Sequence, residues 1–344
     1  MYLWEWLAFE GRIGVDDKKP EQSTEEVERA VKGIPMATVK GSLSSTITDN
    51  NSLYAYNDTY IDVRTPHDEK RGLITLPLGF GLVLFIVMLA FCLYFFGHAV
   101  VTGRAVNGEV ETGLDCILLG ISVLVPLCSL YVYFKYLFRY LRLEAFTARR
   151  LIVRFNRITR KVYLLRPKNI GGIVALDWDK TQAAVDPSMR HEVLPGGGFL
   201  ILSWDTGAVY DADGKLTDDF DGTFVGRTAR NGAELLAFWE YIRRYMEIGP
   251  EAAPPPKKLL SKTPWPWLSF EAAWNILPLR GLRESGMWPM FVMVKVMLLP
   301  VTLIHATGHW ISLLLCYEPK FPPSIENADK WPSPVLPDTS AKLT

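Results

Sequence analysis

Two long apolar runs dominate the hydrophobic pattern of this chain. Residues 73–97 contain no charged side chain, and residues 114–138 carry charge only near their ends, at Asp115 and Lys135. A helix needs roughly 20 apolar residues to cross a hydrocarbon core about 30 Å thick. Both runs are long enough, so the sequence predicts a transmembrane helix hairpin over residues 73–138.

A third hydrophobic segment, residues 286–317, is interrupted by Lys295, Pro300, His305 and His309. Basic residues precede this segment, which favours a single span that places the flexible tail, residues 318–344, outside. The alternative is a re-entrant or interfacial helix pair broken at the proline, which leaves the tail in the cytoplasm. Ionisable groups are costly at membrane depth, so a span would make three of these residues functional candidates: Lys295, His305 and His309.

Positive charge is concentrated directly after the second run, although the chain as a whole has 37 basic and 37 acidic residues. Eleven Lys and Arg residues lie between Lys135 and Lys168, with Glu144 as the only acid. The positive-inside rule therefore predicts that the N-terminus and residues 139–285 are cytoplasmic. The same charges would attract anionic lipids. The predicted membrane-proximal basic belt comprises Arg139, Arg142, Arg149, Arg150, Arg154, Arg157, Arg160 and Lys161.

Residues 143–249 have the pattern of a cytoplasmic β-rich domain. Short strand candidates separated by turn residues predict a barrel or sandwich, and they are Leu151–Phe155, Lys161–Leu165, Ile173–Leu176, Ala183–Val185, Phe199–Trp204 and Ala208–Tyr210. An amphipathic helix then begins at the cap residue Asn231 and ends at Gly249. The sequence thus predicts an α+β membrane protein.

The flanking regions are less regular. Within the N-terminal cytoplasmic region, residues 1–72, Glu21–Lys32 predicts a short helix. In the same region Tyr54–Arg64 alternates like a strand, and we expect it to pack against the later domain. Residues 250–285 combine a proline-rich linker with a membrane-surface helix.

Two stretches of sequence resemble known families. IVRFNRITRKVYLL, residues 152–165, resembles the opening hairpin of the pleckstrin-homology-like (PH-like) domains of bacterial membrane proteins. The overall layout, including YIDVRTPHDEKRG at residues 60–72, resembles an uncharacterised proteobacterial family of polytopic membrane proteins associated with type VI secretion and toxin–immunity gene clusters. The resemblance implies an immunity or accessory protein of the bacterial inner membrane, and it assigns no role to any residue.

Motifs for catalysis or cofactors are weak. His305 and His309 have the i, i+4 spacing of metal ligands, but the motif glutamate and a third ligand are missing. Residues 210–222 are acidic like a calcium loop, yet Lys215 stands at a ligand position and the closing glutamate is absent. Gly196–Gly198 precedes a strand rather than a helix, which argues against a phosphate loop. We therefore predict no enzyme activity, cofactor, metal or nucleic-acid partner.

Three functional classes remain. The first is an interaction protein that binds a toxin or effector protein and contacts membrane lipids. The second is a small transport or channel subunit in which Lys295, His305 and His309 line a path. The third is a lipid-binding membrane scaffold that uses the basic belt.

Overall fold

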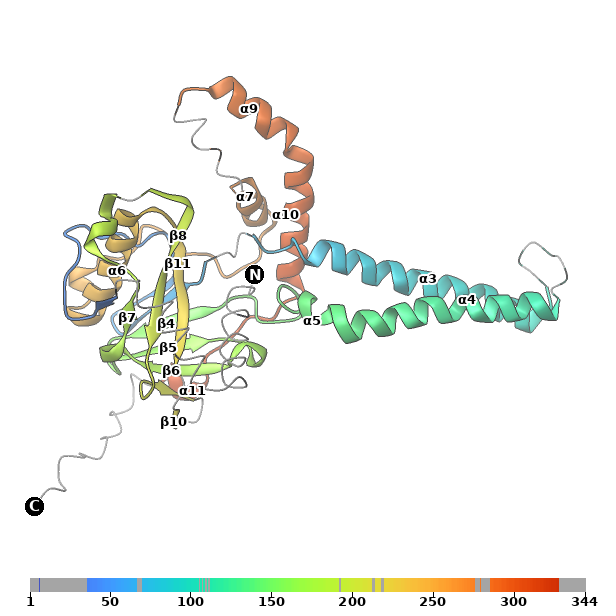
Figure 1. Cartoon of the computed structure of the whole chain (residues 1–344), viewed down its shortest axis with the longest axis horizontal. Helices are drawn as coiled ribbons and strands as arrows, with labels where there is room; N and C mark the ends of the chain where they lie inside the picture. Colours follow the sequence, from blue (N-terminus) through green and yellow to red (C-terminus); the bar gives the residue numbers. More distant parts are fainter. Residues whose placement is uncertain are drawn as a thin grey trace, which may run out of the picture. The chain divides into compact units, whose positions relative to one another are not determined.

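The chain divides into two compact units in the computed structural model (Figure 1). Residues 69–147 and 264–316 form what we call the helical unit, and residues 2–68, 148–263 and 317–344 form the sheet unit. The chain therefore passes from one unit to the other four times between residues 68 and 317. The structure describes Trp6 and residues 36–66, 70–104, 106, 108, 110, 112–191, 193–211, 214–217, 220–275, 279 and 285–327. The helix predicted within Glu21–Lys32 and the tail after Asn327 lie outside these residues.

Two long helices dominate the helical unit and confirm the two predicted apolar helices. Helix α3 spans Thr75–Thr102, and α4 spans Gly113–Val132. A π-helical turn, η2 (Tyr133–Leu137), and α5 (Phe138–Leu141) continue α4. The two helical stretches are 28 and 29 residues long. At 1.5 Å per residue, each measures roughly 40 Å, which is enough to cross a bilayer core.

The third hydrophobic segment forms two helices, which fit a bent single span as well as the re-entrant or interfacial helix pair. Helix α9 (Trp288–Met297) and α10 (Leu299–Leu314) are bent by 58° at the break between them. Pro300 lies in the first turn of α10, where its missing N–H and fixed backbone angle are tolerated. The proline thus separates two helices at the position that the sequence indicated. The same unit also contains α7 (Pro266–Trp274).

Two antiparallel sheets form the sheet unit and confirm the mixed α+β class. Among the described residues the seven-stranded sheet has the order β10-β9-β6-β5-β4-β3-β2, and the four-stranded sheet has the order β1-β7-β8-β11. The strands are β1 (Ala37–Thr38), β2 (Leu53–Tyr56), β3 (Tyr60–Arg64), β4 (Ile152–Asn156), β5 (Lys161–Leu165), β6 (Ile173–Asp177), β7 (Gln182–Ala183), β8 (Val193–Trp204), β9 (Val209–Tyr210), β10 (Leu216–Thr217) and β11 (Asp221–Asn231).

The region before α3 supplies three of these strands. Strand β1 pairs with β7, and β3 pairs with β4 in continuous register from Tyr60↔Asn156 to Arg64↔Ile152. The alternating segment that predicted one strand forms two, β2 and β3. They are separated because the Asn57 side chain accepts hydrogen bonds from the backbone N–H groups of Thr59 and Tyr60. The sheet unit is therefore wider than residues 143–249.

Strand β11 was not predicted, because its sequence, DGTFVGRTARN, hides the alternation behind glycines and basic residues. Gly226 within it has φ +81°, and a Cβ there would lie 2.2 Å from the Phe238 ring. Only glycine fits this backbone conformation and this close approach. The strand thus runs tightly over α6 (Gly232–Glu247).

The core of the sheet unit lies between the two sheets and α6. Asn231 caps this helix as predicted, since its side chain accepts a hydrogen bond from Glu234 N at 2.9 Å. The largest fully buried side chains of this unit are aromatic, and Trp178 and Trp239 are in contact with ring centroids 5.7 Å apart. Both rings belong to the hydrophobic core of this unit.

Glu240 on α6 ties the N-terminal region to the helix. Its buried carboxylate accepts hydrogen bonds from Ser42 Oγ at 2.8 Å and from Arg243 and Arg244. Burial alone would raise the pKa of Glu240, but the hydrogen bonds from these three residues outweigh it and lower the pKa to about 2. Glu240 is therefore ionised at physiological pH.

A buried ion pair joins β3 to β4. Arg154 donates to both carboxylate oxygens of Asp62, at 2.7 and 3.0 Å, and both side chains are buried. The guanidinium also lies 3.7 Å from the ring centroid of Tyr60 and 4.1 Å from that of Phe321. The pair thus links three segments of the sheet unit that are far apart in the sequence.

We expect Asp62→Asn to destabilise the sheet unit by about 3–5 kcal/mol, because it leaves a buried guanidinium without its counter-charge. Thermal unfolding of the purified protein should show the loss as a lower midpoint. Asp58→Asn is the matched control, since Asp58 is exposed and contributes only its backbone carbonyl to Arg157. An equal effect of the two substitutions would contradict the role given to the pair.

Candidate functional site

The predicted basic belt is divided between the two units. Arg139 and Arg142 belong to the helical unit, at the end of the second long helix. Arg139 donates to the hydroxyl of Tyr140 at 2.7 Å. These two residues are the part of the belt that directly follows the apolar helix, where charge fixes orientation most strongly.

The other six belt residues lie in the sheet unit and have protein partners. Arg149 and Arg150 pair with Glu318 at 3.1 and 2.7 Å. Arg154 pairs with Asp62, and Arg157 donates to a backbone carbonyl at 2.9 Å. Arg160 pairs with Asp179 and Glu247, and Lys161 lies over the ring of Tyr210. Much of this positive charge is therefore neutralised within the sheet unit, and its role in topology stays a prediction.

The polar groups of the third hydrophobic segment point into the helical unit. Helix α10 and the residues after it bury one face made of small and polar residues: His305, Ala306, Gly308, His309, Ser312 and Cys316. His305 Nε2 lies 3.0 Å from the backbone oxygen of Arg71, and His309 Nδ1 lies 2.8 Å from Ser269 Oγ. Both predicted histidines thus serve as packing and hydrogen-bonding residues.

Glu144 is the centre of this buried cluster. Its Oε2 atom accepts hydrogen bonds from the backbone N–H groups of Gly72, Ile74 and Thr75, at 2.9 to 3.0 Å, and from the Thr75 hydroxyl. These N–H groups lie at the start of α3. The first N–H groups of a helix have no hydrogen-bond acceptor within the helix itself. A carboxylate at this end also interacts favourably with the helix dipole. We call the group Arg71, Gly72, Thr75, Glu144, His305, His309 and Ser312 the polar node.

Close backbone packing holds the polar node together. A Cβ on Gly72, which has φ +97°, would lie 2.3 Å from the backbone N of His309. A Cβ on Gly308 would lie 2.5 Å from the Leu76 side chain. Ser312 Oγ donates to the backbone oxygen of Glu144 at 2.6 Å. The start of α3, the segment after α5 and the end of α10 are therefore packed against one another.

The chemistry available to the polar node is limited. The two histidine rings have centroids 6.3 Å apart, and no group of three metal-ligating side chains occurs among the described residues. Glu144 Oε1 and His305 Nδ1 have no hydrogen-bond partner in the described part of the chain. The Ser269 hydroxyl contacts a base, His309 Nδ1, at 2.8 Å, but both side chains are buried within the helical unit.

Lys295, the third predicted polar residue, joins α7 to α9. Its ammonium group donates to the backbone oxygen of Trp274 and lies 4.5 Å from the centroid of the Trp274 ring. The side chain is only 8% exposed. Its charge is thus satisfied within the helical unit by a carbonyl and a cation–π contact.

The acidic and glycine-rich motifs have structural explanations. Strands β9 and β10 pair as a hairpin, with Tyr210 opposite Leu216, so Asp211 begins a turn and accepts from Lys215 N at 2.8 Å. Gly196–Gly198 lies inside β8 and not at a helix start. Asp213, Asp218 and Asp219 of the acidic motif lie outside the described residues.

A cavity of about 500 Å³ lies in the sheet unit. Apolar side chains such as Leu165, Ile173 and Val209 line it together with Arg166, Lys168 and Lys320. Arg166 is held by Asp221 in a two-point ion pair at 3.0 and 2.6 Å, which neutralises the central charge. The cavity has no cluster of groups that indicates a particular ligand.

Two features of the sequence point to the polar node, although neither Glu144 nor Arg71 was among the predicted site residues. Glu144 stands out as the only acid among eleven basic residues, directly after an apolar helix. Arg71 precedes the first apolar run, and it is fully buried. A single acid in a basic segment indicates a specific partner. Here the partner is the backbone at the start of α3, which no pattern of side chains in the sequence reveals.

Comparison with known proteins gives one finding. A family model described as "Family of unknown function (DUF6708)" matches residues 129–331, more than half of the chain. The match begins within α4 and includes β4–β11, α6, α7, α9 and α10. No curated protein and no solved structure matches the chain.

We expect Glu144→Ala to destabilise the helical unit strongly, because three backbone N–H groups at the start of α3 lose their acceptor. Each such buried group costs about 1–3 kcal/mol. Glu144→Gln, which keeps one acceptor oxygen, should cost less. Thermal unfolding in detergent would measure both effects.

Asp115→Ala is the matched control, because Asp115 caps the start of α4 at a solvent-exposed position. A drop in the unfolding temperature for Glu144→Ala no larger than that for Asp115→Ala would contradict the central role of Glu144.

Proposed function

Since the chain belongs to a family of unknown function (DUF6708), we propose a role from its own architecture: an integral membrane protein that acts by binding a protein partner. The observation that carries the proposal is the apolar exterior of the helical unit.

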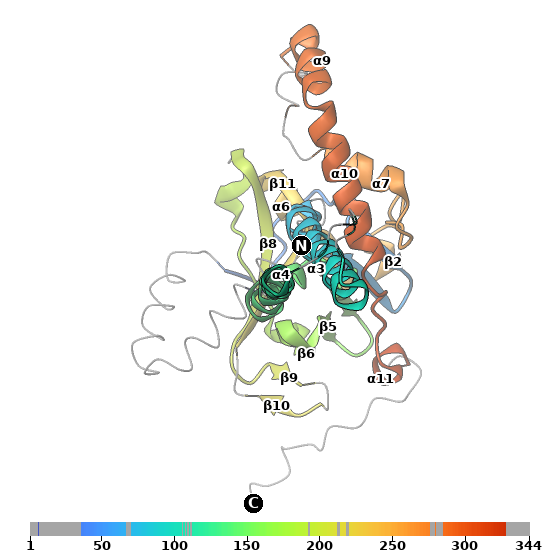
Figure 2. The same ribbon diagram turned by 90° about the vertical axis from the view of Figure 1, so that its right-hand side faces the viewer.

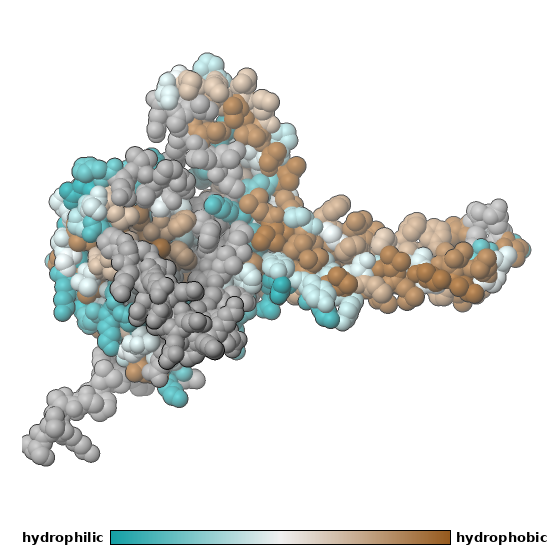
Figure 3. All heavy atoms as spheres, viewed as in Figure 1, coloured by the Kyte–Doolittle hydropathy of each residue, from teal (hydrophilic) through white to brown (hydrophobic). Residues whose placement is uncertain are grey.

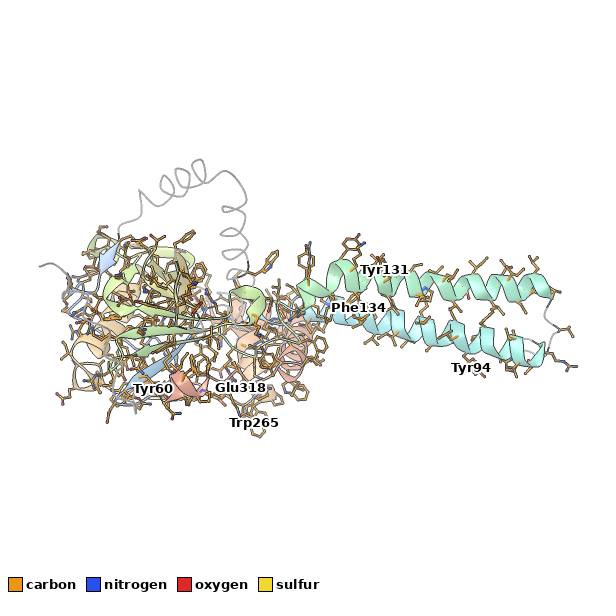
Figure 4. All side chains as sticks on the ribbon, turned by 90° about the horizontal axis from the view of Figure 1, so that it is seen from below. Tyr60, Tyr94, Tyr131, Phe134, Trp265 and Glu318 are labelled. Atoms are coloured by element: carbon orange, nitrogen blue, oxygen red, sulfur yellow. The ribbon has the colours of Figure 1, made fainter. Side chains whose placement is uncertain are left out.

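The exterior of the α3–α4 pair is apolar along its length (Figure 3). Exposed side chains include Phe80 and Phe91 on α3 and Leu114 on α4, at 72%, 63% and 66% exposure. Tyr94 and Tyr131 point away from the hairpin (Figure 4). A water-soluble protein rarely exposes so large an apolar surface, whereas lipid would cover it.

Strand pairing supports a hairpin with both ends on one side. Strand β3 precedes α3, and β4 follows α5, yet the two strands are hydrogen-bonded along five residue pairs. Strands can pair only within one compartment, so two crossings must lie between them. The basic residues after α4 then favour the cytoplasm for the sheet unit, and the family resemblance favours the bacterial inner membrane as the location.

A binding role fits the way in which the chain uses its polar groups. The candidate residues Lys295, His305 and His309 contact carbonyl or hydroxyl groups of their own unit. A protein that neutralises a toxin by covering its surface needs no catalytic group. The resemblance to families near type VI secretion and toxin–immunity genes makes an immunity or accessory protein the concrete form of the proposal.

The transport reading requires the same three residues to line a path. Their internal hydrogen bonds favour a packing role, so transport remains the alternative with less support. A lipid-binding scaffold is also weaker, because six of the eight belt residues have partners inside the sheet unit.

We expect the tagged full-length protein, extracted from its native membrane with mild detergent, to retain one stoichiometric protein partner. Mass spectrometry would identify the partner. If the partner is toxic when expressed alone and harmless with this protein, the immunity form of the proposal is supported.

Lys295→Ala together with His305→Ala separates binding from transport, provided that the variant still reaches the membrane. Retained partner binding and protection would support the binding role. Recovery of the wild-type protein with no partner, or loss of a measurable transport activity in this variant, would contradict it.

A further inference from the structure

We infer that α9 and α10 form a half-inserted helix pair, which enters and leaves the membrane on the side of the sheet unit and does not cross it. The outer face of the pair is covered by acyl chains of one lipid leaflet. This inference rests on the proposed membrane insertion of α3 and α4. It deepens that proposal by assigning a lipid-binding surface to the third hydrophobic segment.

The polarity of α10 is reversed relative to a helix on the surface of a soluble protein. Its buried face carries His305, His309 and Ser312, whereas its exposed face carries Val301, Ile304 and other aliphatic residues without any charge. Helix α9 continues this surface, with Met293 and Val296 more than half exposed. An apolar outer face backed by a polar, hydrogen-bonded inner face is the arrangement expected beside lipid.

The chain leaves the sheet unit before α7 from a fixed position. Leu260 N donates to the backbone oxygen of Leu53 in β2 at 2.8 Å. Arg150 donates to the backbone oxygen of Ser261 at 3.3 Å and also to that of Lys262. Residues 260–262 therefore lie on the side of the membrane where the sheets fold.

The chain returns to the same unit directly after α10. Tyr317 forms a β-bridge with Ala148, and Glu318 pairs with Arg149 and Arg150. Phe321 packs against a cluster on the seven-stranded sheet that includes Ile152 and Tyr163. Only two residues, Leu315 and Cys316, lie between Leu314, the last residue of α10, and Tyr317. Three residue-to-residue steps extend at most about 11 Å. The end of α10 is thus on the same side as residues 260–262.

A single crossing by α9–α10 would therefore require residues 264–287 to cross as well. Helix α7 has nine residues, which at 1.5 Å each cover roughly 14 Å, less than half of the core. The segment also carries four charges, each worth about 2.5–3.5 kcal/mol at the bilayer centre: Glu271, Arg280, Arg283 and Glu284. A second crossing there is unfavourable, which leaves the half-inserted pair.

Contacts within the helical unit agree with this path. Trp310 on α10 donates to the backbone oxygen of Pro264 at 3.1 Å, so the chain entering α7 lies beside the returning helix. In two perpendicular views α10 runs across the α3–α4 pair and not alongside it (Figures 1 and 2). If α3 and α4 cross the bilayer, a helix that runs across them is roughly parallel to the membrane plane.

The first experiment determines the side of the segment after α10. Single cysteines are introduced as Ser324→Cys, Lys257→Cys and Val110→Cys in the full chain, after the four natural cysteines are replaced by Ala or Ser. Each variant is treated with a membrane-impermeant maleimide in right-side-out and inside-out vesicles. We expect Ser324→Cys to label in the same vesicles as Lys257→Cys, and Val110→Cys in the opposite ones. Labelling of Ser324→Cys together with Val110→Cys would overturn the inference in favour of a single span.

The second experiment tests the lipid contact. An environment-sensitive fluorophore is attached at Ile304→Cys, and the protein is placed in phosphatidylcholine–phosphatidylglycerol nanodiscs with doxyl-labelled lipid. We expect quenching comparable to that at Leu118→Cys on α4, and none at Ile158→Cys, an exposed apolar position of the sheet unit. Quenching at Leu118→Cys alone would overturn the lipid face of α10. Loss of quenching at both positions would instead contradict the membrane proposal itself.

Discussion

The helical unit depends on one carboxylate that serves the start of a helix distant in sequence. A helix leaves its first N–H groups without partners, and in a buried setting water cannot supply them. Glu144, which follows the second long helix, accepts from three such groups at the start of the first. The two long helices are therefore joined at this end by hydrogen bonds between backbone N–H groups and a carboxylate. These bonds do not depend on the apolar packing between the helices. The two histidines and Ser312 of the third segment complete the same node.

The sheet unit has a similar reliance on charge between distant segments. Asp62 precedes the hairpin, Arg154 follows it, and Phe321 comes after the last apolar segment, yet the three side chains meet on one sheet. Glu318 joins Arg149 and Arg150 in the same way. Arginines that resemble a membrane-proximal belt in the sequence thus act as connectors between strands and termini. A count of basic residues cannot distinguish charges beside a membrane from ion pairs between segments. The distinction depends on which acidic residues lie next to each arginine in the folded protein.

Local patterns predicted most elements of the fold correctly. The two apolar helices, the strands β5 and β6, the Asn231 cap and the break near Pro300 all follow from periodicity and from residue-specific backbone preferences. Local patterns could not predict which segments far apart in the sequence contact each other. Nothing near Tyr60 indicates that its strand pairs with residue 156, and nothing near Glu144 indicates that its acceptor role is directed to the backbone at Gly72. The candidate site was found only in part for this reason: its histidines were evident in sequence, and its organising carboxylate was not.

The pairing of β3 with β4 also sets an order of events during biosynthesis. Arg64 and Ile152, which face each other in the sheet, are separated by 152 − 64 = 88 residues. At about 5–20 residues per second, a ribosome needs roughly 4 to 18 s to make that interval. Throughout this time β2 and β3 have no sheet to join, because both long helices are made before β4. Strands β2 and β3 therefore present an unpaired edge until β4 is made, and an unpaired strand edge is prone to aggregation. A protein built in this way depends on the order in which its segments are made as much as on its final contacts.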